Sequence, residues 1–183
     1  MAPVINVFKK DSVNFKTLVA VTAQHREMLD QVLSVFDIIP DYDLDLMSKS
    51  QTLESLTGKI LNGISRLLIQ IQPDLIFVQG DTTTTFSASL AAFYKKIPVG
   101  HIEAGLRTND IYSPFPEEIN RRMTSSIASH HFPPTRQAEQ CLLDEGVNKE
   151  KIMVTGNTVI DALLTVSRKV ESDSSEYEEY FLN

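Results

Sequence analysis

The amino-acid sequence predicts a doubly wound α/β domain, in which helices cover both faces of a parallel sheet. Two observations predict this class. Short β-branched runs alternate with longer amphipathic stretches along most of the chain. In addition, residues 74–79 (DLIFVQ) form an almost continuous apolar run, which is typical of a strand buried on both faces.

Each expected element has its own signal. Residues 53–71 carry apolar side chains at three-to-four spacing, which predicts a long helix that Pro73 ends. Threonines open the segment 82–94, and threonine caps a helix well. We expect strands at 17–22, 74–79, 97–102, 131–132 and 152–155. We expect helices at 4–10, 26–36, 53–71, 82–94, 116–129, 137–145 and 159–170.

The start of the chain departs from this pattern. A doubly wound sheet usually opens with a central strand and a glycine-rich turn. Here residues 4–10 predict a helix instead, and no glycine precedes Gly58. The sequence therefore indicates that the first strand is missing or that the sheet begins differently.

Composition excludes several classes of protein. The 183 residues are 42% hydrophobic and 22% charged, which is close to a globular average and unlike a disordered or collagen-like chain. No apolar run is long enough to span a bilayer, and no signal peptide is recognisable. The single Cys141 excludes an internal disulfide and suits a reducing cytosol. We therefore expect a cytoplasmic protein without a membrane partner.

The charge is unevenly distributed. The net charge of −7 argues against a nucleic-acid partner. Residues 171–183 hold five acidic and no basic residues, whereas the rest of the chain holds 19 acidic and 17 basic residues. We expect a domain over residues 1–168, followed by an acidic tail or interdomain linker stub at 169–183.

Carboxylates follow the expected strands at one edge of the sheet, where open parallel sheets bind ligands. Asp81 and Glu103 come directly after strands, and Glu117 opens a helix after a loop. Neighbouring carboxyl groups can divide the roles of general acid and general base, so these three are the candidate catalytic residues. Two have structural alternatives, because Asp81 suits a helix cap and Glu117 suits the first turn of a helix.

Substrate-binding candidates lie at the same edge. Arg107 is able to bind a phosphate or carboxylate with two hydrogen bonds, or to pair with Glu103. Gly156 and Asn157 precede a helix whose backbone N–H groups suit a phosphate, although a Gly-Asn turn with a threonine cap explains them equally well. Arg121 and Arg122 are expected on a solvated helix face, where their partners are the preceding acids. The four histidines lack metal-ligand spacing, so we expect no metal site.

The chain resembles the non-hydrolysing UDP-N-acetylglucosamine 2-epimerases of bacteria and archaea. The resemblance spans roughly residues 1–168 and is carried by five segments: TAQHREMLDQVL (22–33), QGDTTTTFSASLAAFY (79–94), VGHIEAGLRT (99–108), YSPFPEEINRR (112–122) and VTGNTVIDALL (154–164). It implies the two-domain glycosyltransferase-B-type fold, in which two Rossmann-like halves surround a cleft. This chain would be the amino-terminal half.

The resemblance also implies a reaction and roles for residues. Family enzymes interconvert UDP-N-acetylglucosamine and UDP-N-acetylmannosamine for surface polysaccharides. They eliminate UDP to give 2-acetamidoglucal and then add it back with C2 inverted, without a metal or redox cofactor. Asp81, Glu103 and Glu117 match acids implicated in moving the C2 proton. Gln24, His25 and Gln51 match positions that bind a second, allosteric UDP-N-acetylglucosamine molecule in bacterial members.

Two family features have no counterpart in the sequence. These are the opening strand with its Gly-Thr-Arg-Pro-Glu turn, and the second domain, which holds UDP. Three interpretations follow: an enzyme half that a complementing carboxyl-terminal chain activates, a non-catalytic fragment that at most binds a nucleotide sugar, and a glycosyltransferase-type domain. The carboxylate motifs disfavour the third. We expect an inactive isolated chain, and a homodimer for the complete family enzyme.

Overall fold

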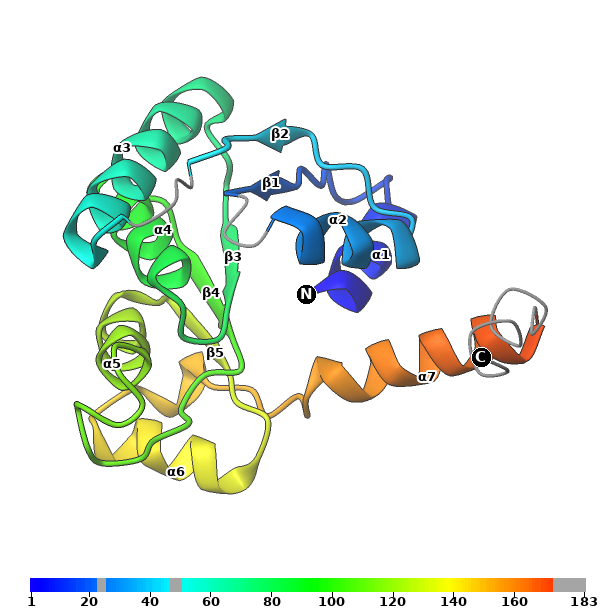
Figure 1. The fold of residues 1–183 in the computed structure, drawn as a ribbon. Helices are drawn as coiled ribbons and strands as arrows, with labels where there is room; N and C mark the ends of the chain where they lie inside the picture. Colours follow the sequence, from blue (N-terminus) through cyan, green and yellow to red (C-terminus); the bar gives the residue numbers. More distant parts are fainter. Residues whose placement is uncertain (23–25, 47–50, 173–183) are drawn as a thin grey trace. The chain divides into compact units, whose positions relative to one another are not determined.

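The computed structural model describes residues 1–22, 26–46 and 51–172 (Figure 1). These residues form two compact units. The larger unit contains residues 21–22, 43–46 and 51–156, and it includes the expected catalytic positions. The smaller unit contains residues 1–20, 26–42 and 157–172.

A parallel three-stranded sheet forms the centre of the larger unit. Its strands are β3 (Ile76–Gln79), β4 (Val99–Ile102) and β5 (His130–Phe132), in that order across the sheet. The register aligns Val78 with His101, and His101 with His131. The predicted α/β class with parallel strands is therefore confirmed.

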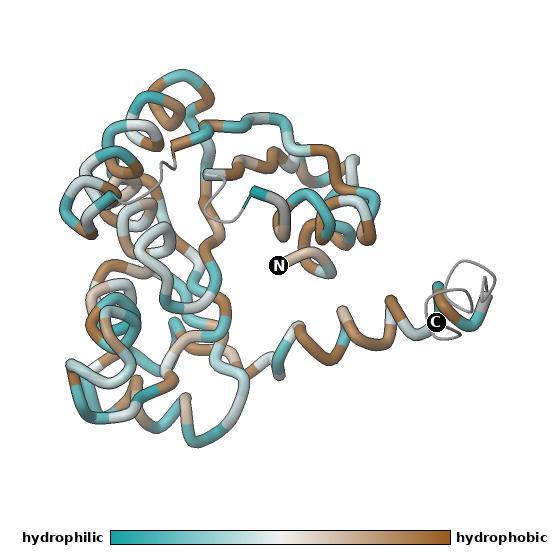
Figure 2. The backbone as a smooth tube through the Cα atoms, in the orientation of Figure 1, coloured by the Kyte–Doolittle hydropathy of each residue, from teal (hydrophilic) through white to brown (hydrophobic). Residues whose placement is uncertain are grey.

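Three helices cover one face of this sheet: α3 (Leu53–Ile71), α4 (Thr83–Tyr94) and α5 (Glu117–Ile127) (Figure 1). Helix α4 begins after the expected threonine cap, because Thr82 accepts a hydrogen bond from the backbone N–H three residues later, and Thr52 caps α3 in the same way. Apolar and polar residues alternate along α3 (Figure 2). Its apolar side packs with α4 and the sheet around Ile60, Ala91, Ala92 and Val99, all at most 1% exposed.

A second, smaller cluster of buried side chains follows β5. Here α6 (Arg136–Asp144) and the 3₁₀ turn η1 (Lys149–Lys151) bring together Ala104, Leu142 and Ile152. Gly105 lies against α6 with a φ of +84°, and a Cβ atom at this position would lie 2.9 Å from Leu142 Cγ. This close approach requires glycine.

Two strand predictions need correction. The strand expected at 17–22 is reduced to β1 (Ala20–Val21), which pairs with a strand that the sequence did not predict, β2 (Tyr42–Asp43). The strand expected at 152–155 is wrong, because only Ile152 bridges to His131. Met153 and Thr155 still donate to the His131 and Pro133 carbonyls, so the segment runs along β5 without forming a regular strand.

The smaller unit contains three helices: α1 (Ala2–Lys10), α2 (Arg26–Val35) and α7 (Thr158–Ser172). Helix α1 packs against α7, and Lys169 of α7 binds the Asp37 carboxylate at 2.6 Å. Helix α7 continues past the expected domain boundary at residue 168. The rest of the predicted tail, 173–183, lies outside the described residues. No helix in the described ranges is long and apolar enough to cross a membrane.

Candidate functional site

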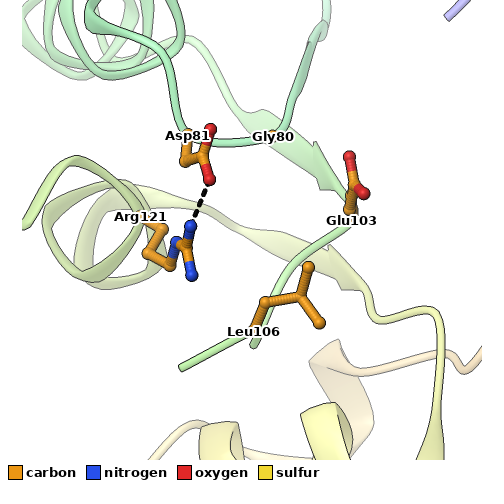
Figure 3. Close-up of a pocket in the computed structure, with 5 residues that line it drawn as sticks. All are labelled: Gly80, Asp81, Glu103, Leu106 and Arg121. Carbon is orange, nitrogen blue, oxygen red and sulfur yellow. Dashed lines mark hydrogen bonds and ion pairs between the residues drawn. The ribbon is translucent and has the colours of Figure 1, made fainter. Parts of the chain in front are cut away.

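A pocket of about 130 Å³ lies at the carboxyl edge of the sheet. Gly80 and Asp81 follow β3, Glu103 and Leu106 follow β4, and the α5 residue Arg121 completes the lining (Figure 3). Two of the three predicted catalytic carboxylates, Asp81 and Glu103, therefore line one pocket. The reason is the parallel sheet, which delivers the ends of successive strands to one edge.

Asp81 is tied to α5. Its carboxylate forms an ion pair with the Arg121 guanidinium (Figure 3), and its backbone carbonyl accepts from Asn120 Nδ2 at 3.0 Å. The alternative role of Asp81 as a helix cap is not observed, because Thr82 caps α4. The Asp81 side chain is 31% exposed and so remains accessible from the pocket.

Glu103 occupies an unusual backbone conformation. Its φ of +65° lies in the left-handed region, which is costly for a residue other than glycine. Its N–H donates to the Phe132 carbonyl at 3.0 Å, which fixes it to the end of β5. A Cβ atom at Gly80 would lie 3.6 Å from Glu103 Oε2, so the carboxylate packs closely against the turn that carries Asp81.

Arg121 corrects a sequence prediction. It was expected on a solvated face, but it is 9% exposed and lines the pocket. The expected pairing along the helix is confirmed, since Glu118 contacts Arg121 at 3.3 Å and Arg122 at 3.0 Å. Arg121 therefore bridges Glu118 and Asp81. Its positive charge compensates the Asp81 carboxylate and so reduces the repulsion between Asp81 and Glu103, which line the same pocket.

Glu118, which the sequence did not single out as a site residue, anchors the loop beside the pocket. It is fully buried, and its carboxylate accepts hydrogen bonds from the backbone N–H groups of Thr108 (3.1 Å) and Asn109 (3.3 Å). Burial acts to raise the pKa of Glu118, but the hydrogen bonds from Thr108 and Arg122 and the charge of Arg121 hold it below its usual value. The carboxylate is therefore ionised. The one signal for this role was its spacing of three and four residues from two arginines.

The remaining predicted site residues fall elsewhere. Glu117 is half-buried at the first position of α5 and is not among the residues that line the pocket. Gln51 precedes α3 and accepts from Lys59 Nζ at 3.1 Å. Gln24 and His25 lie outside the described residues.

Arg107 has a structural partner. Its guanidinium donates to both carboxylate oxygens of Glu145 at 2.7 Å, and also to Ser125 Oγ at 3.0 Å. Its side chain is only 2% exposed. The structure thus pairs Arg107 with Glu145, joining the loop after β4 to the end of α6, whereas the sequence offered a bound anion or Glu103 as its partner.

Gly156 and Asn157 form the turn before α7. Gly156 adopts a φ of +80°. Asn157 Oδ1 accepts the Val159 N–H at 3.0 Å, and the Asn157 carbonyl accepts the Ile160 N–H. This geometry agrees with the alternative of a Gly-Asn turn at a helix start, with asparagine rather than threonine as the acceptor.

The described residues hold no cluster of three or more His, Cys, Asp or Glu side chains that suits a metal ion. The pocket itself is lined by two carboxylates and one guanidinium. Such groups are suited to proton transfer and to the binding of polar or anionic ligands.

The fold and the pocket together define a class of protein. The chain contains a parallel α/β sheet, with a pocket beyond the carboxyl ends of its strands. MurG from Acinetobacter baumannii shares this fold with a TM-score of 0.58 at 15% identity, over 85% of this chain and 40% of that one.

Sequence comparison gives the particular family. Residues 8–182 match the family described as UDP-N-acetylglucosamine 2-epimerase, and the chain belongs to this family. It is 54% identical over 179 residues to the UDP-N-acetylglucosamine 2-epimerase of Salmonella typhimurium, covering 97% of this chain and 47% of that protein. It is 55% identical over 172 residues to the Escherichia coli K12 enzyme, covering 94% and 46% of the two chains.

Solved structures agree with this assignment. The UDP-GlcNAc 2-epimerase of Neisseria meningitidis, bound to UDP-GlcNAc, superposes with a TM-score of 0.93 at 52% identity, over 97% of this chain and 48% of that one. The Methanocaldococcus jannaschii enzyme in complex with UDP-GlcNAc and UDP gives 0.89 at 36% identity, over 98% and 49%. The chain thus spans about half the length of the relatives that it matches.

Proposed function

We propose that this chain supplies the carboxylate-bearing half of a non-hydrolysing UDP-N-acetylglucosamine 2-epimerase. The observation that carries the proposal is the joint placement of Asp81, Glu103 and Arg121 around one pocket. Asp81 and Glu103 are the candidates for removing and returning the C2 proton, and Glu117 is the third candidate acid. Inversion at C2 needs proton transfer on both faces of the sugar, and two carboxylates at one pocket are able to supply both transfers.

The complete enzyme would eliminate UDP to give 2-acetamidoglucal and add UDP back with C2 inverted. The matched relatives are about twice as long as this chain. In the proposal, the groups that hold UDP therefore belong to the remaining half.

We propose a cytoplasmic setting, UDP-N-acetylglucosamine as substrate, and a homodimer for the complete enzyme. Gln24, His25 and Gln51 are the proposed contacts of an allosteric UDP-N-acetylglucosamine, and Arg107, Gly156 and Asn157 stay candidates for substrate binding.

A second candidate function rests on the same length comparison. By itself, a chain that spans about half of its relatives would bind a nucleotide sugar weakly, without turnover. Titration of the purified chain with UDP-N-acetylglucosamine tests for this weak binding. Steady formation of UDP-N-acetylmannosamine by the chain alone would contradict the second candidate function.

The catalytic roles are tested in a completed protein, defined as this chain joined to the parts of the Salmonella typhimurium relative outside the matched segment. Asp81→Asn, Glu103→Gln and Glu117→Gln should each lower kcat, by about 100-fold or more for a group that transfers the proton. The measurements are kcat and deuterium incorporation at C2 in D₂O. Glu150→Gln, on an exposed residue of η1, is the control and should keep normal turnover. Normal turnover and exchange in all three site variants would overturn the assignment.

A further inference from the structure

The turn that carries Asp81 is held at three consecutive backbone carbonyls, those of residues 79–81. Each carbonyl accepts from a side chain of a different element, namely α4, β4 and α5. The donors are Thr85 Oγ1 (2.7 Å), His101 Nε2 (2.8 Å) and Asn120 Nδ2 (3.0 Å). The position of Asp81 is thereby fixed by its surroundings rather than by its own side chain alone.

His101 differs from the other two donors because it is titratable. It is fully buried in the middle of β4, and so it has no surface to offer to a substrate. Its partner, the Gly80 carbonyl, only accepts hydrogen bonds, so the proton lies on Nε2. Among the described residues no donor reaches Nδ1, which leaves the hydrogen bond to Gly80 as the polar contact of this imidazole.

The surroundings of His101 keep it uncharged. Burial lowers the pKa of His101 to about 4, against a smaller opposing effect of the Gly80 hydrogen bond. Of the charged groups around it, Arg107 and Arg121 favour the neutral ring and Asp81 favours the charged one. The neighbouring titratable group on β5 is His131, whose pKa burial also lowers to about 4.

We propose that His101 is a positioning residue, whose Nε2–H fixes the Gly80–Asp81 turn and so directs the Asp81 carboxylate into the pocket beside Arg121. Gly80 has a φ of +72°. Because glycine has no side chain, the contacts that fix this conformation must come from neighbouring residues. The catalytic consequence rests on the proposed function, in which Asp81 acts on the substrate. The hydrogen bond from His101 and its effect on the turn do not depend on the proposed function.

His131 provides a matched control. It is 1% exposed, lies beside His101 in register, and has an Nδ1 atom without a partner among the described residues. Its imidazole interacts with the Ala128 backbone instead of the site turn. Replacing either histidine by leucine removes a buried imidazole from the same face of the sheet, but only one of the two replacements releases Gly80.

The first experiment uses the chain itself and needs no activity. In ¹⁵N-resolved NMR spectra, His101 should show the Nε2–H tautomer and should not titrate between about pH 5.5 and 8. His101→Leu should shift the amide signals of Gly80 and Asp81, whereas His131→Leu should leave them in place. A titrating His101, or unshifted Gly80 and Asp81 signals in His101→Leu, would overturn the proposal.

The second experiment measures kinetics in the completed protein. His101→Leu should lower kcat by about 10- to 100-fold through misplacement of Asp81, with KM changed less than about 2-fold. His101→Gln, whose amide N–H reaches the same position, should recover most of kcat, and His131→Leu should keep it. Equal losses in both leucine variants, or no recovery with glutamine, would refute the positioning role. If the unmodified completed protein has no turnover, the proposed function fails, and the NMR result alone decides this inference.

Discussion

At the residue scale, the candidate site depends on a chain of charges that crosses α5. Glu118 is fully buried and binds Arg121, which binds Asp81 in turn. A buried ion pair contributes modestly to stability as a whole, but removal of one partner leaves the other charge without compensation. The network therefore acts mainly to hold two elements in a fixed relation beside the pocket.

Glu118→Gln should lower the free energy of unfolding of the chain by about 3–5 kcal/mol, because it leaves Arg121 and Arg122 partly unpaired. The neighbouring Glu117→Gln is the matched control. Glu117 is half-buried at the first position of α5, outside the buried network of Glu118, so the expected change is within about 0.5 kcal/mol. Urea denaturation of the three proteins measures both values. Similar stability of Glu118→Gln and the unmodified chain would show that Glu118 does not anchor this network.

The residues of the site were only partly predictable. Asp81 and Glu103 follow buried strands, and the end of a parallel strand is where a site is expected. Arg121 was missed because its partner lies 40 residues earlier in the chain. A one-dimensional pattern identifies neighbours on one helix, such as Glu118 and Arg121, but not which face of α5 meets the turn after β3.

At the element scale, helices were predicted more accurately than strands. The periodic segment 53–71 gave the bounds of α3 (Leu53–Ile71), because seven apolar positions repeat along one face. The two-residue strands β1 and β2 carry no such repeat. The segment 152–155 has a strand-like composition, but it meets β5 at a single bridge, since pairing depends on a neighbour that composition does not reveal.

The contact between the loop after β4 and α6 is sensitive to a single methyl group. Gly105→Ala should lower the free energy of unfolding by about 2 kcal/mol or more, because its φ is +84° and the added Cβ meets the Ala138 backbone. Gly58→Ala is the control, since a Cβ atom in that part of α3 meets nothing within 4 Å. It should instead raise stability by about 0.5–1 kcal/mol. Thermal or urea unfolding compares the two, and an unchanged Gly105→Ala variant would contradict the tight packing described.

At the scale of the whole molecule, the chain carries the candidate pocket but spans only about half the length of its relatives. The fold class was predictable from alternating strands and helices, and the family from long motifs that surround the carboxylates. The division into two compact units was not predictable, because no linker composition marks it in the sequence. In our proposal the larger unit carries the proton-transfer groups, and the nucleotide is held by the part that the chain does not span.

The most direct test follows the C2 hydrogen of UDP-N-acetylglucosamine in D₂O, with the chain alone and with the completed protein, each checked for folding by circular dichroism. We expect deuterium at C2 together with UDP-N-acetylmannosamine for the completed protein, and neither for the chain alone. The exchange should fall by about 100-fold or more when Asp81 or Glu103 is neutralised. A folded completed protein without exchange, or sustained turnover by the chain alone, would show that this chain does not supply the proton-transfer half of the enzyme.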